Sequence, residues 1–140
     1  HLGFRGEALP SIASISKTTL HTQSQTKGRS VFFEYGKLIK DRPYDGPVGT
    51  TVIVENLFHN TPARLKHLKS VYYEASLIIS LIEKFALVNP HIHFRLQDEE
   101  KILLNTSGSN QLLEVYTQVY GSQVGQYAHE FNFSDYDFSV

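Results

Sequence analysis

Two glycines near the start of the chain could bring backbone amides close to a phosphate group. Gly3 and Gly6 bracket a Phe-Arg pair, and a helix is predicted to begin directly after them. Glycine permits backbone angles and close approaches that a side chain would block, and the first N–H groups of a helix attract anions. The spacing therefore predicts half of a nucleotide site. Without further support, a plain loop that leads into a helix is the more ordinary interpretation.

A basic cluster further along the chain could contact nucleic-acid phosphates. It consists of Arg64, Lys66, His67 and Lys69, on a helix whose start is indicated by Thr61 as N-cap and by the proline after it. Cations on one helix are suited to phosphate contacts. The alternative is a solvated helix face, which we favour because no aromatic side chains are interleaved.

Two other groups of polar residues carry weaker signals. His91 and His93 alternate on a predicted strand and could share a face, but no carboxylate or third histidine joins them. We expect ordinary strand histidines there and no metal site. Ser11, Ser14 and Ser16 lack the histidine and aspartate partners of a hydrolase. No catalytic residue is predicted.

The elements that must position these residues follow an α+β pattern. A short helix is predicted over residues 6–14, with Glu7 in its first turn. β-rich runs are predicted to begin at Lys17, Arg29, Leu38 and Thr50, with turns between them. A longer helix over residues 72–88 has apolar residues at helical spacing, which we expect to cover one face of the sheet.

The remaining residues are predicted to form a hairpin, a linker and a second group of elements. The hairpin covers residues 91–105, with Asp98, Glu99 and Glu100 at its tip. Residues 106–110 (TSGSN) are the best linker candidate, because they are small and polar. A short amphipathic helix over residues 111–121 follows, and a new β region begins after it.

Composition sets limits on the function. The chain has 140 residues, of which 41% are hydrophobic, and a formal net charge of −1. A packed core is therefore possible, whereas broad electrostatic binding to nucleic acid or to a membrane is not supported. There are no cysteines, and no apolar run is long enough for a membrane span, so a cytoplasmic protein is the default. With no methionine and a strand-like end, the chain is expected to be an internal fragment.

Two segments carry a resemblance to a known family. Residues 2–16 (LGFRGEALPSIASIS) resemble the third nucleotide-binding motif of the MutL family of DNA mismatch-repair ATPases. Residues 49–70 (GTTVIVENLFHNTPARLKHLKS) resemble the fourth motif of that family and the signature after it. The two motifs at this distance are highly specific, and bacterial MutL is the most similar member.

The resemblance implies a fold and a domain organisation. Residues 1–107 would be the later part of a Bergerat (GHKL) ATPase sandwich, a mixed sheet with helices on one face. Residues 108–140 would begin the transducer domain, which resembles ribosomal protein S5 and is truncated here.

The resemblance also implies roles for single residues. The phosphate-loop positions would be Gly3, Phe4, Arg5, Gly6, Glu7, Ala8 and Leu9. Thr50 would belong to the polar network around adenine, although an ordinary strand threonine is an equal alternative. A carboxylate in the first turn stabilises a helix start, so we assign that role to Glu7 and not the role of general base.

Other parts of the family's catalytic machinery are not found in this sequence. They are the general-base glutamate, the magnesium-binding asparagine and the D-x-G-x-G motif that contacts adenine. ATP and Mg²⁺ are therefore expected to bind the intact parent protein. The chain alone is expected neither to hydrolyse ATP nor to bind it tightly.

The resemblance implies a parent that uses ATP to drive lid closure and N-terminal dimerisation. It would couple a MutS-like mismatch-recognition partner to downstream repair on DNA, in the cytoplasm of bacteria or in the nucleus of a eukaryote. The alternative is a non-catalytic DNA-binding or dimerisation module that uses the basic cluster. Another Bergerat ATPase, such as a topoisomerase subunit, is disfavoured by the Asn-Thr-Pro-Ala-Arg signature.

Overall fold

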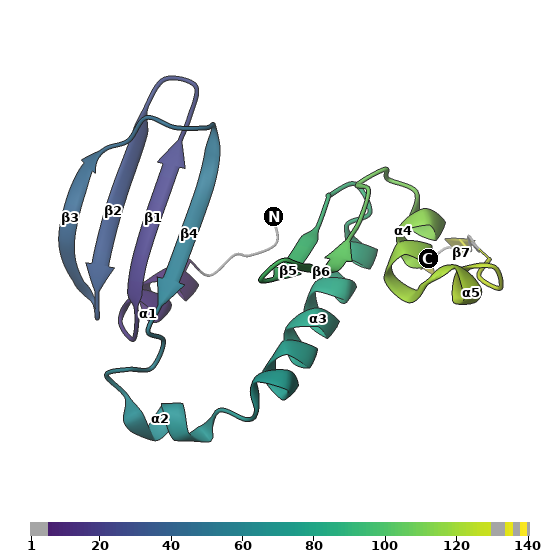
Figure 1. Ribbon diagram of the computed structural model, residues 1–140. Helices are drawn as coiled ribbons and strands as arrows, with labels where there is room; N and C mark the ends of the chain where they lie inside the picture. The colour runs from purple at the N-terminus through teal and green to yellow at the C-terminus, as the bar shows by residue number, and fades with distance from the viewer. Residues whose placement is uncertain (1–5, 130–133, 136–137, 140) are drawn as a thin grey trace. The chain divides into compact units, whose positions relative to one another are not determined.

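The computed structural model describes residues 6–129, 134–135 and 138–139. Three residues of the predicted phosphate loop, Gly3, Phe4 and Arg5, lie outside these ranges. The chain divides into two compact units, His1–Leu68 and Lys69–Val140. Each unit has its own helices and its own β-structure (Figure 1).

The first unit is built on a four-stranded antiparallel sheet. Its elements are α1 (Ala8–Ala13), β1 (Lys17–Gln23), β2 (Gly28–Glu34), β3 (Lys37–Pro43), β4 (Gly49–Glu55) and α2 (Pro62–His67). The strand order is β3-β2-β1-β4. The four predicted strands are thus confirmed, and each begins within about one residue of its predicted start, the usual uncertainty of an element boundary. β3 is exposed along its length, and its register against β2 shifts between Phe32 and Phe33.

The two faces of this sheet differ in polarity. Leu20 of β1 lies opposite Val31 of β2 and Val52 of β4, whereas its neighbour His21 lies opposite Ser30 and Thr51. Since side chains alternate along a strand, the first set marks an apolar face, which we call the inner face, and the second a polar outer face. The alternation gives the sheet one face suited to apolar packing, although Ser30 on the outer face is also buried.

Helix α1 packs on the inner face. Leu9 and Ala13 of α1, together with Leu20 and Phe33 of the sheet, line an apolar hollow of about 320 Å³. Within the same unit, Ser16 and Thr18 are buried and their hydroxyls lie 2.8 Å apart. The polar residues that enter this interior therefore satisfy each other.

The second unit contains the long helix and a hairpin. Its elements are α3 (Val71–Val88), β5 (Arg95–Asp98), β6 (Lys101–Asn105), α4 (Leu112–Tyr120), α5 (Ser122–Gly125), β7 (Ser134–Asp135) and β8 (Phe138–Ser139). Ser70 caps α3 by accepting a hydrogen bond from the Tyr73 N–H. α3, β6 and α4 pack together around Ala86, Leu104 and Val115, which are buried.

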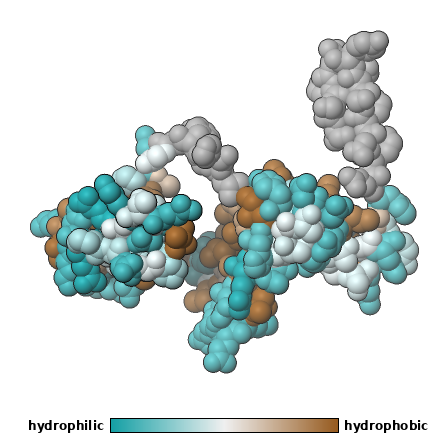
Figure 2. Space-filling model, turned by 90° about the horizontal axis from the view of Figure 1, so that it is seen from above, coloured by the Kyte–Doolittle hydropathy of each residue, from teal (hydrophilic) through white to brown (hydrophobic). Residues whose placement is uncertain are grey.

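Only part of the apolar stripe on α3 is buried within this unit. Leu77, Ile78 and Leu81 are each about half exposed, at 50%, 51% and 52%. Figure 2 shows apolar side chains at the surface beside hydrophilic ones. That α3 covers one face of the four-stranded sheet stays a prediction.

Three details differ from the sequence-based expectations. The first helix begins at Ala8, because Gly6 has φ +66° and Glu7 is the N-cap residue, so Glu7 is not in the first turn. His91 and His93 precede β5 and do not lie on the strand. The short helix α5 was not predicted.

The predicted linker at residues 106–110 forms hydrogen bonds to the segment before β5 and to α4. The Thr106 hydroxyl is buried and accepts a hydrogen bond from the Phe94 N–H at 3.0 Å. The Ser107 N–H donates to Gln118 of α4 at 2.9 Å. Gly108 has φ +67°, and a Cβ there would lie 2.8 Å from the backbone of His93. The domain boundary at 107/108 stays a prediction.

No helix among the residues that the structure describes has both the length and the apolar character needed to cross a membrane.

We predict that Thr106→Val lowers the free energy of unfolding of the chain by about 1–3 kcal/mol. Valine has the shape of threonine but leaves the partly buried Phe94 N–H without its side-chain acceptor. Urea unfolding measures the effect, and Thr106→Ser, which keeps the hydroxyl, should be less destabilising. Equal stability of the valine variant and the wild type would contradict this account.

Candidate functional site

The turn between β2 and β3 forms two backbone hydrogen bonds to the junction between α1 and β1, residues 13–16. The N–H of Gly36 donates to the carbonyl oxygen of Ala13 at 2.8 Å, and the N–H of Tyr35 donates to that of Ser16 at 2.9 Å. Both turn residues have positive φ, +47° for Tyr35 and +84° for Gly36. The hairpin turn thus closes on the end of the helix.

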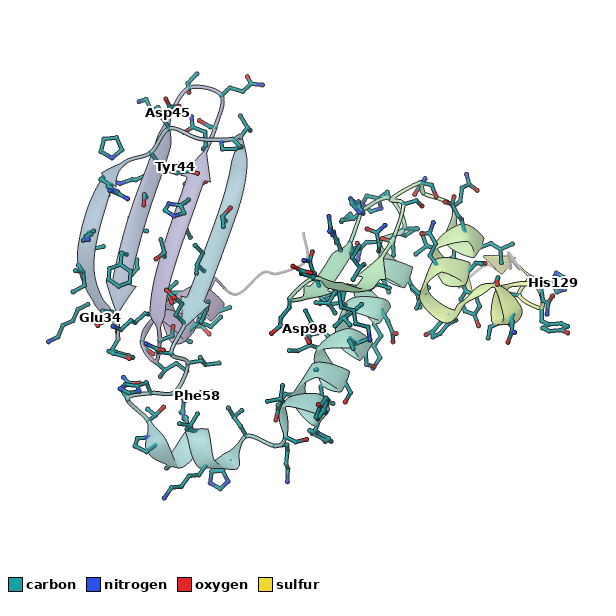
Figure 3. All side chains as sticks on the ribbon, viewed as in Figure 1. Glu34, Tyr44, Asp45, Phe58, Asp98 and His129 are labelled. Atoms are coloured by element: carbon teal, nitrogen blue, oxygen red, sulfur yellow. The ribbon has the colours of Figure 1, made fainter. Side chains whose placement is uncertain are left out.

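A second turn, between β4 and α2, holds the two carbonyls that remain at this junction. The N–H of Phe58 donates to the carbonyl oxygen of Ile15 at 2.9 Å. The side-chain Nδ2 of Asn60 donates to that of Ser14 at 3.2 Å. Four consecutive carbonyls are therefore bound by two turns that are distant in sequence. Phe58 marks the second turn in Figure 3.

The β4–α2 turn has an unusual backbone. Asn56 has φ +53° and Phe58 has φ +64°. Asparagine tolerates the left-handed region, whereas phenylalanine adopts it at a cost in conformational energy. The hydrogen bond of the Phe58 N–H to Ile15 helps to offset this cost. This turn leads directly into Asn60 and the Thr-Pro pair that begins α2.

The described part of the predicted phosphate loop, from Gly6 to Leu9, lies at the start of α1. Gly6 has φ +66°, and nothing lies within 4 Å of the position that a Cβ would take. Glu7 is exposed, and its side chain makes no capping hydrogen bond. This geometry leaves the helix start without a carboxylate folded over it.

Thr50 lies on the inner face, at the end of the sheet away from α1. Its Oγ1 is 2.9 Å from the Oγ1 of Thr22, which lies directly opposite it on β1. The inner-face positions toward α1 are Leu20 and Thr18 on β1, opposite Val52 and Val54 on β4. The threonine pair therefore forms a polar end on a mostly apolar face.

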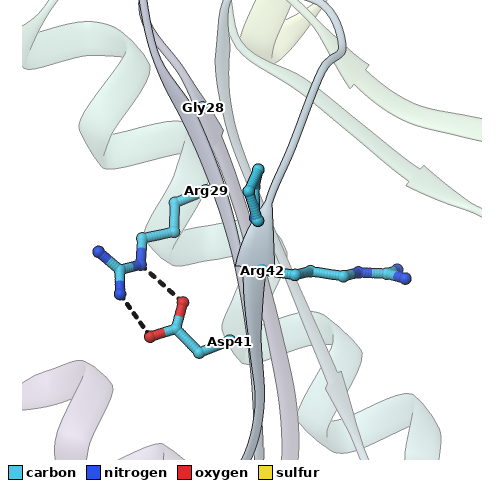
Figure 4. Close-up of a pocket in the computed structure, with 5 residues that line it drawn as sticks. Gly28, Arg29, Asp41 and Arg42 are labelled. Carbon is cyan, nitrogen blue, oxygen red and sulfur yellow. Dashed lines mark hydrogen bonds and ion pairs between the residues drawn. The ribbon is translucent and has the colours of Figure 1, made fainter.

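An ion pair extends this polar end across β2 and β3. Nε and Nη2 of Arg29 each donate to a carboxylate oxygen of Asp41 at 2.6 Å (Figure 4). These hydrogen bonds from the Arg29 guanidinium hold the pKa of Asp41 below its usual range. Arg42 points to the opposite face (Figure 4). A pocket of about 260 Å³ lies beside these residues.

The outer face carries a separate hollow near the same strand ends. The ring of His21 stacks on that of Tyr44 with centroids 4.8 Å apart. Together with Thr51 and the loop that precedes β4, they line a pocket of about 270 Å³. Tyr44 and Asp45 mark this loop in Figure 3.

The basic residues of α2 are exposed. Arg64, Lys66 and His67 lie in its last turn, and Lys69 begins the second unit. The ion pairs found among residues 6–129 join Lys17 to Glu34 and Arg29 to Asp41, so they do not involve this cluster.

The described residues contain no group of three or more side chains suited to hold a metal ion. His93 is instead 2.9 Å from the side-chain oxygen of Asn105 on β6.

Two residues of the site, Thr22 and Asn60, were missed by the sequence reasoning. Asn60 belongs to the Asn-Thr-Pro-Ala-Arg signature, which indicated its importance but not its acceptor. Thr22 carries no signal of its own, because only the register of β1 against β4 brings it to Thr50.

The chain is similar to bacterial proteins named DNA mismatch repair protein MutL. No family model matches it. It is 44% identical to MutL of Shouchella clausii over 125 residues, which are 89% of this chain and 19% of that protein. It is 43% identical to MutL of Streptococcus mutans over 141 aligned residues, which are 99% of this chain and 22% of that protein. The chain thus spans about a fifth of the length of these curated relatives.

The fold of this chain is similar to that of solved structures with similar names. The Aquifex aeolicus MutL ATPase domain complexed with ADP has a TM-score of 0.77 and 36% identity, over 81% of this chain and 48% of that chain. The N-terminal domain of a DNA repair protein has a TM-score of 0.77 and 26% identity, over 94% of this chain and 42% of that one.

We predict that Asn60→Asp loosens the α1–β1 junction. The aspartate replaces a donor by an acceptor that faces the Ser14 carbonyl, at an expected cost of about 0.5–1.5 kcal/mol. Amide hydrogen exchange measures the effect locally, and exchange at Phe58 and Gly36 should accelerate. Amides in the β1–β2 ladder, such as that of Val31, are the internal control. Unchanged protection at Phe58 would show that Asn60 does not hold the turn.

Proposed function

Because the chain belongs to the MutL family of DNA mismatch-repair proteins, we propose that it contributes part of an adenine-nucleotide site. In this proposal the start of α1 binds the phosphates and Thr50 belongs to the polar network around the base. The observation that carries the proposal is the shared inner face, since α1 and Thr50 lie on the same side of the sheet.

The phosphate end of the proposed site fits its ligand. Gly6 has the positive φ that glycine adopts readily, and the space where a Cβ would lie is open. The side chain of Glu7 does not cap the helix. Backbone N–H groups near Gly6, Ala8 and Leu9 are therefore suited to an anion, and Gly3, Phe4 and Arg5 complete the loop in this proposal.

The distance between the phosphate end at α1 and the base end at Thr50 suits a nucleotide. Thr22 is four residues beyond Thr18, which lines the hollow beside α1. At about 3.3 Å per residue this is roughly 13 Å along β1. A nucleotide, with its phosphates at one end and its base at the other, is a ligand of that extended kind. The hydroxyl of Thr50 can both donate and accept a hydrogen bond.

Among the residues that the structure describes, we identify no ligand for magnesium and no base for the attacking water. The described residues hold no metal-ligating cluster, and Glu7 lies at the phosphate end, where a carboxylate would repel the ligand. When bound, Mg²⁺ would neutralise phosphate charge. Its ligand and the general base would come from other parts of the parent protein.

The activity of the whole protein is part of the same proposal. The parent would bind and hydrolyse ATP, close a lid over it and dimerise through its N-terminal region. Its partners would be DNA and a MutS-like mismatch-recognition protein. The relatives are bacterial DNA-repair proteins, which supports a bacterial cytoplasmic location.

DNA contact through the basic cluster is a second candidate function. Arg64 and Lys66 are exposed on α2, and neither takes part in an ion pair of the described residues. Their charge is therefore available for phosphates, as is that of Lys69, which is also exposed.

We predict that Gly6→Val weakens ATP binding by the full-length protein about tenfold or more. A β-branched residue is strained at φ +66°, so the loop would lose the conformation that brings its amides to the phosphates. Calorimetric titration of ATP with Mg²⁺ measures the affinity.

The matched control is Gly121→Val. Gly121 also has positive φ, +88°, but ends α4, so this variant should keep its ATP affinity. The 140-residue chain alone should release no phosphate above the background of its Gly6→Val variant. Wild-type affinity in the Gly6 variant, or turnover by the isolated chain, would contradict the proposed division of roles.

We predict that Lys66→Glu combined with Lys69→Glu weakens DNA binding and reduces its salt dependence. Each lost phosphate contact lowers the slope of log K against log salt by about 0.9 on duplex DNA, so the slope should fall by about 2. Duplex binding at several salt concentrations measures this. The charge-matched control is Lys40→Glu with Arg42→Glu on the outer face of β3, and equal losses in both variants would indicate a general charge effect.

A further inference from the structure

We propose that Thr22 is a positioning residue for Thr50 in the nucleotide site. The inference rests on the proposed function, because it concerns how the Thr50 hydroxyl is held for an adenine nucleotide. Thr22 lies outside both segments that resemble the family motifs, residues 2–16 and 49–70. Its link to the site is the 2.9 Å separation between the two hydroxyl oxygens.

The backbone fixes this pair of residues. β1 and β4 pair without interruption from Lys17 and Glu55 at one end to Gln23 and Gly49 at the other. In that register Thr22 stands directly opposite Thr50, and opposed residues have Cβ atoms about 4.5–5.5 Å apart on the same face. The hydroxyl contact thus follows from strand pairing and not from loop conformation.

The chemical consequence concerns the rotamer of Thr50. The branched Cβ of threonine carries a hydroxyl and a methyl group, and χ1 decides which of them is presented to a ligand. A hydrogen bond to Thr22 selects the rotamer that directs Oγ1 of Thr50 along the inner face. Thr22 therefore acts on the orientation of Thr50 and need not touch the nucleotide.

The neighbouring side chains that the structure describes offer the hydroxyls of Thr22 and Thr50 no competing hydrogen-bond partner. Their inner-face neighbours toward α1 are Leu20 and Val52, which have no polar group. On the other side, Arg29 is engaged by Asp41. Among the described residues, no other hydrogen bond reaches the side chain of Thr50. Removing the Thr22 hydroxyl would therefore leave Thr50 without a partner that fixes its rotamer.

The hydrogen bond between Thr22 and Thr50 is expected to contribute little to the stability of the fold. Thr50 is exposed and Thr22 is only partly buried, so water can replace the lost hydrogen bond in a variant. A change at Thr22 is therefore expected to alter ligand affinity more than thermal stability.

A double-mutant cycle in the full-length protein, titrated with ADP, tests the proposal. Thr22→Val should weaken ADP binding about three- to tenfold, the range expected for one hydrogen bond. Thr22→Ser should restore it, because the hydroxyl is retained. The double variant Thr22→Val with Thr50→Val should bind no more weakly than Thr50→Val alone, because Thr22 acts through Thr50.

Thr19→Val, on the outer face of the same strand, is the matched control and should keep wild-type affinity. Thermal unfolding identifies variants that lose the fold, and Thr22→Ala replaces Thr22→Val if the latter does. Unchanged affinity after loss of the Thr22 hydroxyl, or additive losses in the double variant, would overturn this inference alone. Failure of the wild type to bind ADP would overturn the proposed function as well.

Discussion

The arrangement of the first unit depends on four consecutive backbone carbonyls at the end of α1. Each is bound by a donor from another part of the chain, two from the β2–β3 turn and two from the β4–α2 turn. α1 has only six residues, too few to be stable by its own hydrogen bonds. The helix that presents the proposed phosphate loop is therefore held by tertiary contacts. Among them is one from Asn60 in the family signature.

The second constraint is the difference between the two faces of the sheet. A face lined by Leu20, Val31 and Val52 must be covered by apolar partners, whereas the outer face carries polar residues, of which Ser30 is buried and His21 stacks on Tyr44. The hydroxyls of Thr22 and Thr50 interrupt the apolar face at one end only. A polar end on a face that is otherwise suited to packing supports the proposed nucleotide site on the same face as α1.

Local signals in the sequence predicted most of the elements, but not how they meet. Thr61 and Pro62 marked the start of α2, and the β-rich runs marked the strands. The first helix was predicted too long, because a glycine permits a positive φ without requiring it, so the sequence alone did not place the helix start after Gly6. The phosphate-loop residues came from a family resemblance. Thr22 and the acceptor of Asn60 could not be found, since the partners of these residues lie 28 and 46 residues away and only the folded chain joins them.

The edge strand β3 has a consequence for association between copies of the chain. An open strand edge can pair with a strand of another molecule, and charged residues, bulges and prolines prevent this. β3 carries Lys37, Lys40 and Arg42, has an irregular register against β2, and ends at Pro43, which lacks an N–H donor. A second copy would have to bury these cations and pair with an irregular strand. This edge of the sheet is thereby protected against the intermolecular β-pairing that begins aggregation.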